Sequence, residues 1–207
     1  MTEEEKKQLL QKLKEKIEAD KNLPLLESNL VFGEGNPNAH LMFIGEAPGF
    51  FEDQQKRPFV GKAGQLLNKL IEETLELKRE EVYITNIVKR RPPQNRDPKE
   101  EEIKSYQPYL TEEIKIISPQ IIATLGRFSM NYFLPNARIS KDHGKIFWFK
   151  EKIVFPLYHP AAALRSLEVL KDLKLDFQKL KIVLEKFPEL LEKRKKDTKF
   201  HTQKSLF

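Results

Sequence analysis

The residues best suited to chemistry begin at a Gly/Pro turn, residues 45–49 (GEAPG), which directly follows the apolar run 41–44. A strand that breaks into such a turn can leave backbone N–H groups free to face a ligand. Acidic side chains follow at Glu52 and Asp53, and Phe59 lies among small residues, which suggests a slot for a flat molecule. An ordinary strand–loop–helix connection explains the glycines equally well, because a Gly-rich turn is a weak signal.

Two further stretches carry polar side chains next to apolar runs. Asn86 lies in the run 82–88 and either reads a base with its amide or, more simply, binds local backbone at a strand end. Residues 89–96 (KRRPPQNR) hold four basic residues, two prolines and no acid, which predicts a stiff phosphate-binding loop or a solvated surface loop. His159, in the stretch 158–165 (YHPAAALR), is by itself most simply a turn residue.

Apolar runs predict the strands that must position these residues. Strands are expected at 30–32, 41–44, 82–88 and 120–126, and residues 145–155 alternate as a hairpin with a turn at 150–151. Helical spacing predicts helices at 2–20, 62–77, 97–117, 127–133 and 167–187, the last ended or kinked by Pro188. Because helices and strands alternate, we expect a three-layer α/β/α sandwich around a central, mostly parallel four-stranded sheet.

Length and composition predict one α/β domain over residues 1–190, including an N-terminal helix at 1–20, followed by a basic tail at 191–207. The net charge of +6 permits a nucleic-acid partner. The chain has no cysteine, which excludes disulfides, thiolate metal sites and iron–sulfur clusters. Residues 1–20 lack the apolar core of a signal peptide, and no apolar run approaches about 18 residues, so we expect a soluble, intracellular protein.

Several separated motifs, in the same order, together resemble the family 4 uracil-DNA glycosylases of bacteria and archaea. They are GEAPG at 45–49, ED at 52–53, PFVGKAGQLL at 58–67, YITNIVKRRPPQNRDP at 83–98 and YHPAAALR at 158–165. The resemblance implies a hydrolase that removes uracil from DNA, leaves an abasic site and so initiates base excision repair. It further implies a monomer without a cofactor that acts in the cytoplasm, on the nucleoid of a bacterium or archaeon.

The resemblance also implies that uracil is flipped out of the DNA stack into a pocket. Phe59 would supply the ring on which uracil stacks, and the Asn86 amide would bind uracil N3–H and O4. Gly45 and Ala47, in the Gly/Pro turn, would place backbone N–H groups on uracil O2. His159 would donate to the same oxygen as negative charge builds on the leaving base.

Glu46 and Glu52 are the carboxylates implied to lie nearest the chemistry, where either would order water or stabilise the sugar cation. Ala47 stands where other glycosylase families keep a catalytic Asp, so the general base is left unassigned, with Asn95 a lesser candidate for ordering water. Leu164 would wedge into the gap left by the flipped base. The side chains implied to contact the DNA backbone are Arg90, Arg91, Asn95, Arg96 and Arg165.

Family 4 enzymes normally hold an iron–sulfur cluster on four cysteines, and this chain departs from that pattern. Aligning the motifs places Arg90 and Tyr106 at two of the four positions, and the other two fall near Asp20 and Leu23. We therefore expect no metal here, with Arg90 packed against Tyr106 in place of the cluster. The loop 89–96 also lacks the histidine through which a related branch bonds covalently to uracil-DNA, so covalent trapping is not expected.

The C-terminal residues Gln203 to Phe207 (QKSLF) resemble the short peptide that binds a DNA sliding clamp. A disordered chain end explains the same five residues. Two hypotheses therefore stand beside the enzyme. One is a non-catalytic protein of the same fold that binds uracil-DNA or damaged DNA, and the other is a repair adaptor that is recruited to a clamp through this tail.

Overall fold

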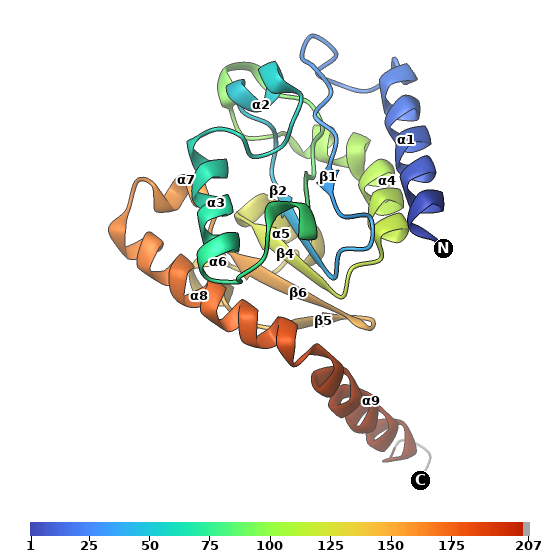
Figure 1. Ribbon diagram of the computed structural model, residues 1–207, viewed down its shortest axis with the longest axis vertical. Helices are drawn as coiled ribbons and strands as arrows, with labels where there is room; N and C mark the ends of the chain where they lie inside the picture. Colours follow the sequence, from blue (N-terminus) through green and yellow to red (C-terminus); the bar gives the residue numbers. More distant parts are fainter. Residues whose placement is uncertain (205–207) are drawn as a thin grey trace.

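A six-stranded sheet forms the centre of the computed structural model, which describes residues 1–204, with side chains described up to residue 196. The strands are β1 (Glu34–Gly35), β2 (Leu41–Gly45), β3 (Tyr83–Asn86), β4 (Ile121–Leu125), β5 (Phe147–Phe149) and β6 (Lys152–Leu157), in the order β1-β3-β2-β4-β6-β5. The four central strands run parallel, and the short edge strands β1 and β5 run antiparallel (Figure 1). This confirms the predicted four-stranded parallel sheet and adds two edges to it.

The helices are α1 (Glu3–Ala19), α2 (Phe50–Gln55), α3 (Lys62–Glu73), α4 (Glu100–Ile117), α5 (Arg127–Phe133), α6 (Ile139–Asp142), α7 (Pro160–Ala163), α8 (Leu167–Glu185) and α9 (Phe187–Lys204). Short 3-10 turns lie at Arg79–Glu81 and Pro93–Asn95. No helix within the described residues combines the length and the apolar character that crossing a bilayer requires.

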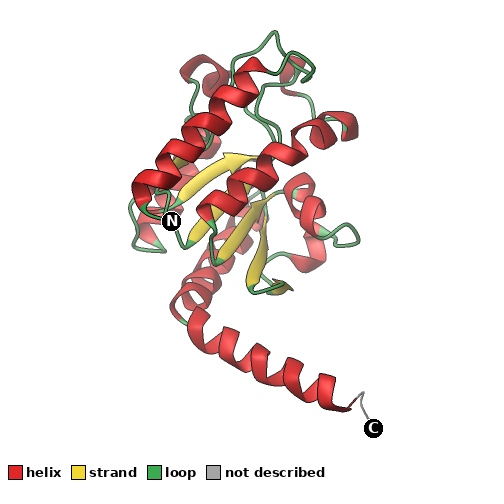
Figure 2. Ribbon diagram, turned by 90° about the vertical axis from the view of Figure 1, so that its right-hand side faces the viewer, coloured by secondary structure: helices red, strands yellow, loops and turns green. Residues whose placement is uncertain are grey.

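Helices cover both faces of the sheet, which confirms the three-layer sandwich. Figure 1 shows α1 and α4 on one side of the sheet and α3 and α8 on the other, and Figure 2 shows helices flanking the strands on both sides. The side chains of β2 alternate accordingly: Leu41 and Phe43 join the core under α3 and α8, whereas Met42 and Ile44 join the core under α1 and α4. A strand buried on both faces is apolar throughout, which is why its sequence is a continuous run.

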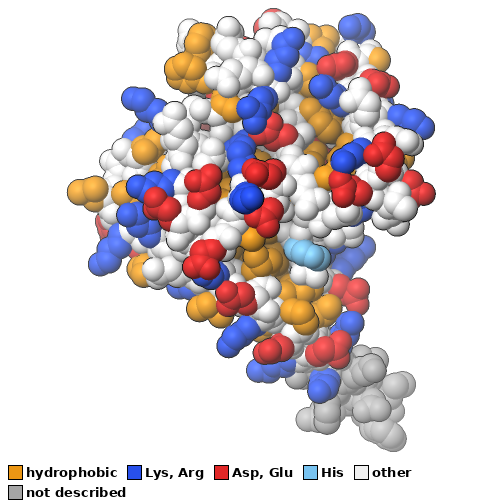
Figure 3. Space-filling model, viewed as in Figure 1, with side chains coloured by type: hydrophobic (Ala, Val, Ile, Leu, Met, Phe, Trp, Pro, Cys, Tyr) orange, Lys and Arg blue, Asp and Glu red, His pale blue; other side chains and the backbone are white. Residues whose placement is uncertain are grey.

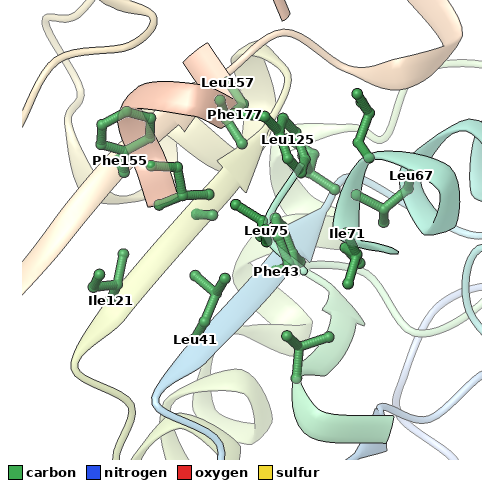
Figure 4. Close-up of a cluster of buried hydrophobic side chains, with 14 of the residues drawn as sticks. Leu41, Phe43, Leu67, Ile71, Leu75, Ile121, Leu125, Phe155, Leu157 and Phe177 are labelled. Carbon is green, nitrogen blue, oxygen red and sulfur yellow. The ribbon is translucent and has the colours of Figure 1, made fainter. Parts of the chain in front are cut away.

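A hydrophobic core packs α3 and α8 against one face of the sheet (Figure 4). Phe43 of β2 stacks on Phe177 of α8 with ring centroids 5.9 Å apart. Leu67 and Ile71 of α3 are fully buried in the same cluster. These contacts hold α3 against the sheet, so that the loop leading into α3 is held above the end of β2.

One local prediction differs from the structure. The strand predicted at 30–32 is wrong, because Leu30 makes only an isolated bridge with Arg90, and the edge strand forms instead at Glu34–Gly35. The predicted break near Pro188 is confirmed, because α8 ends at Glu185 and a new helix, α9, begins at Phe187 with Pro188 in its first turn, where the missing N–H costs nothing. The predicted clamp-binding residues 203–207 lie outside the part of the chain whose side chains are described.

A fully buried ion pair joins the segment directly after β3 to α4. Lys89 and Glu113 have no exposed side-chain surface, and they contact each other directly. The Tyr83 hydroxyl donates to Glu113 Oε1 at 2.9 Å, and Lys89 Nζ donates to Thr85 Oγ1 at 2.6 Å. Burial lowers the pKa of Lys89, against the opposing effect of Glu113. This network explains why a central strand carries the polar residue Thr85.

Polar contacts occupy the region where the family's cysteines align. The Tyr109 hydroxyl donates to Asp20 Oδ2 at 2.5 Å, and the Tyr106 hydroxyl donates to Pro24 O at 2.8 Å. The Arg90 guanidinium donates to the backbone carbonyl of Ser28. Burial raises the pKa of Tyr106, against the lowering effect of its hydrogen bond with Arg90.

These residues do not fit an iron–sulfur cluster. No thiolate is available, because the chain has no cysteine. Within the described residues, no three His, Cys, Asp or Glu side chains gather as ligands of a metal ion. The contacts of Arg90, Tyr106 and Tyr109 instead tie the 20–28 segment to the 89–96 loop and to α4.

Replacing Lys89 by Met should destabilise the protein by about 3–5 kcal/mol, because Glu113 would be left buried without a counter-charge. Lys104→Met is the matched control, since Lys104 pairs with Glu100 while the two side chains are 69% and 81% exposed. Its expected cost is below about 0.5 kcal/mol. Guanidinium denaturation measures both variants, and an equal midpoint for the two would contradict the importance of the buried pair.

Tyr106→Phe should lower the free energy of unfolding by about 1–3 kcal/mol, because the partly buried Pro24 carbonyl loses its donor. Tyr132→Phe is the control, since that hydroxyl lies 3.4 Å from its acceptor, the Gln107 carbonyl. Thermal melts with and without an iron chelator should coincide. A chelator-dependent melting temperature, or a Tyr106→Phe variant as stable as the parent, would count against a metal-free replacement of the cluster.

Candidate active site

The predicted residues meet at the carboxyl ends of the parallel strands, where ligands bind in open α/β sheets. A cavity of about 400 Å³ opens there. The predicted residues that line it are Glu46, Ala47, Glu52, Phe59, Asn86, Asn95, Arg96, His159 and Arg165. A larger groove, of about 710 Å³, lies between α4, α5, β5 and α9 and contains none of the predicted residues.

The amide of Asn86 is the central feature of the cavity. Asn86 ends β3 beside Gly45 of β2 and is 2% exposed. Its Oδ1 atom is buried and has no hydrogen-bond partner among the described residues. A buried polar atom without a partner costs free energy, so this oxygen is suited to accept from a ligand.

Gly45 allows the amide and an aromatic ring to approach each other. A Cβ atom at this position would lie 2.4 Å from Asn86 Oδ1 and 2.5 Å from Phe59 Cζ, closer than any real contact. The Phe59 side chain is 5% exposed, and its backbone has a φ of 52°. Gly45 therefore contributes space, which its position in a Gly/Pro turn did not reveal.

Glu52 positions Phe59. Its Oε1 atom accepts from the backbone N–H groups of Val60, at 2.9 Å, and Gly61, at 2.8 Å. The carboxylate thus anchors the loop directly after Phe59 to α2. Since one oxygen already binds two backbone donors, Glu52 is better suited to holding the ring in place than to exchanging a proton.

The His159 ring stacks against the Phe59 ring, with centroids 5.7 Å apart, and both residues line the cavity. It caps the short helix α7, and its Nδ1 atom accepts from the Ala161 N–H at 3.1 Å. Burial lowers the pKa of His159 to about 4, against the opposing effect of Glu52. The ring is therefore neutral near pH 7, with its proton on Nε2, the nitrogen that remains available as a donor.

Burial has the opposite consequence for Glu46, whose pKa it raises to about 7. The carboxylate accepts from the N–H of Phe128, at 3.2 Å, in the first turn of α5. Gly126, with a φ of +93°, makes room for it: a Cβ atom there would lie 2.3 Å from Glu46 Oε1 and 3.1 Å from His159 Cβ. The sequence analysis assigned no role to Gly126, for which the leucine–glycine–arginine motif at 125–127 was the available signal.

The basic loop separates into inward and outward side chains. The prediction that Arg90 contacts phosphates needs correction, because its side chain is buried and bonds to the Ser28 carbonyl. Arg96 lines the cavity and pairs with Glu102 at 2.5 Å. Arg91 Nε donates to Asn95 Oδ1 at 2.6 Å, so the Asn95 amide oxygen already has one hydrogen bond.

Leu164, at the end of α7, is 52% exposed and lies beside the cavity rather than lining it.

Comparisons with known proteins show which family the chain belongs to. A profile of the uracil DNA glycosylase superfamily matches residues 32–181. The chain is 50% identical to the Type-4 uracil-DNA glycosylase of Sulfurisphaera tokodaii over 83% of each chain. It is 40% identical to the Type-4 uracil-DNA glycosylase of Archaeoglobus fulgidus over 74% of this chain and 81% of that protein, and 43% identical to that of Thermotoga maritima over 70% and 76%. The chain therefore belongs to the uracil DNA glycosylase superfamily.

Proposed function

We propose that this protein is a uracil-DNA glycosylase, which hydrolyses the N-glycosidic bond of uracil in DNA and leaves an abasic site. The observation that supports this most directly is the buried, unpartnered Oδ1 atom of Asn86, at a cavity that Phe59 and His159 also line. The relatives, named as uracil-DNA glycosylases, do not favour the alternative of a non-catalytic binding protein. We further propose residues 1–190 as the catalytic domain, with 191–207 appended to it.

In this proposal, uracil leaves the DNA stack and enters the cavity as a flipped base. Its ring stacks on Phe59, and the Asn86 amide binds both atoms of one edge. Oδ1 accepts from uracil N3–H, which gives the orphaned oxygen its missing partner, and Nδ2 donates to O4. Cytosine presents an unprotonated N3 and an amino group at these positions, so the same amide orientation would leave both bonds unmade.

The glycosidic bond breaks with its electron pair going to the base, and negative charge then develops on uracil O2. Nε2–H of His159, with backbone N–H groups of the 45–49 turn, donates to that oxygen. Because the imidazole is neutral, it stabilises the charge as a fixed donor and keeps its proton. Water adds to the cationic sugar carbon, its proton passes to a base, and the uracil anion takes a proton from solvent.

We assign Glu46 as the carboxylate that orients this water, in preference to Glu52. One oxygen of Glu52 is already committed to two backbone N–H groups. Glu46 has a pKa raised to about 7 by burial, close to the pH at which a general base works best. On the DNA side, Leu164 fills the gap left by uracil, and Arg165, Arg91 and Arg96 face the phosphates.

Asn86→Ala and His159→Ala should each lower kcat/KM on a uracil-containing oligonucleotide by about 10²–10³-fold, because each removes a donor or acceptor aimed at the departing base. Alkali-labile strand cleavage on a gel measures the product. Asn38→Ala and His40→Ala are matched controls, since both side chains are exposed near the amino end of β2. Retention of parental activity in both active-site variants would overturn the site assignment.

The pH profile should report Glu46. A carboxyl with a raised pKa is protonated below that pH and charged above it, so kcat/KM should rise about tenfold per pH unit up to about 7 and then level off. His159, with a pKa of about 4, should add no step above about pH 5. Single-turnover rates between about pH 5 and 9 test this. Glu46→Gln should give a lower, flat profile, and a parental profile that is flat down to about pH 5 would exclude this role.

A further inference from the structure

Two adjacent phenylalanines on α2 expose their rings beside the cavity, and the mechanism uses neither. Phe50 is 48% exposed and Phe51 is 55% exposed, and the rings meet edge to face with centroids 5.5 Å apart. The residues on either side of the pair, Gly49 and Glu52, both line the cavity. Figure 3 shows hydrophobic surface at the upper left of the view, over the position of α2 in Figure 1. Large exposed aromatic rings mark a contact surface.

A cation completes this surface. The Arg91 guanidinium lies over the Phe50 ring, 5.1 Å from its centroid. It is held there by Asn95, at 2.6 Å, and by the carboxylate of Asp53, at 3.9 Å. Asp53 is itself buried and accepts from the Asn29 backbone N–H at 2.8 Å. The guanidinium plane and the ring are thus fixed in relation to each other before any ligand arrives.

Helix α2 is also anchored on its other side. Glu52 follows Phe51 directly and binds the backbone of Val60 and Gly61. The two rings therefore sit on a short, tethered helix, between the loop that presents Phe59 and the basic loop 89–96. Little conformational freedom would be lost when a ligand stacks on them, which favours binding.

We propose that Phe50, Phe51 and Arg91 form a stacking site for the nucleobase next to uracil in single-stranded DNA. This inference rests on the proposed function and adds a second base-binding position to it. A strand whose uracil enters the cavity must cross the cavity rim, and this surface forms part of that rim. Aromatic rings and guanidinium planes accept any base by its face, and the positive charges of Arg91, Arg96 and Arg165 suit the phosphates on either side.

The energetic consequence is a contribution to binding and not to bond cleavage. A base stacked on an aromatic ring contributes about 1–3 kcal/mol. The neighbouring base makes the same contact before and during cleavage. Loss of this stacking contact should therefore raise KM and leave kcat unchanged. In duplex DNA the neighbouring base remains paired and stacked, so the effect should be confined to single strands.

The experiment compares the full-length protein with Phe50→Ser/Phe51→Ser on single-stranded oligonucleotides containing one uracil. The matched control is Phe149→Ser, since Phe149 is also 48% exposed but lies in the distant groove between α4 and α9. A second set of oligonucleotides replaces the base on the 5′ or the 3′ side of uracil with an abasic spacer. Steady-state kcat and KM are measured for every combination, and fluorescence quenching of 2-aminopurine at the same two positions reports stacking directly.

We expect the spacer on one side to raise KM of the parent and of Phe149→Ser about 5- to 150-fold, the range that corresponds to 1–3 kcal/mol. The double variant should have that raised KM already, with no further change from the spacer and with less quenching. Equal sensitivity of variant and parent to the spacer would overturn the proposal. A change in oligomeric state of the variant with unchanged KM would assign the surface to a protein partner instead. Absence of uracil release by the parent would reject the proposed function, a result that is distinct from either.

Discussion

An amide oxygen that the fold buries without a partner is the constraint on which the site depends. Asn86 can hold this position because β3 pairs in parallel with β2, which places Asn86 beside Gly45. The glycine leaves room for the amide and for the Phe59 ring at the same time. Burying this oxygen without a partner costs free energy, and a ligand with a matching donor removes that cost.

Burial shifts the pKa values of two titratable groups at the cavity in opposite directions. Taking a group out of water disfavours its charged form, which lowers the pKa of His159 and raises the pKa of Glu46. The result is a neutral imidazole, which can donate without losing its proton, next to a carboxyl that titrates near neutrality. Gly126 allows both side chains to occupy one desolvated corner, because any side chain there would collide with Glu46.

Polar contacts also occupy the region where the resemblance to family 4 enzymes implies cysteines. Arg90, Tyr106 and Tyr109 bind carbonyl and carboxylate oxygens of the segment that a cluster would otherwise tether. The arginines of the basic loop 89–96 therefore differ in their surroundings. Arg90 is committed to the interior, whereas Arg91 and Arg96 remain at the rim of the cavity. Buried and more exposed basic side chains thus lie within a few residues of each other in one loop.

The sequence by itself determined the layer architecture, since continuous apolar runs require strands buried on both faces and helical spacing identified the covering helices. It also predicted Asn86, Phe59, His159 and Glu46 as site residues, because separated motifs in a fixed order carry more information than any one residue, and these four residues line one cavity. Only the tertiary structure decided which way Arg90 points, that Glu52 supports a loop, and that Phe50 and Arg91 share a surface. Those outcomes depend on contacts between segments far apart in the chain, which no local pattern of residue types encodes.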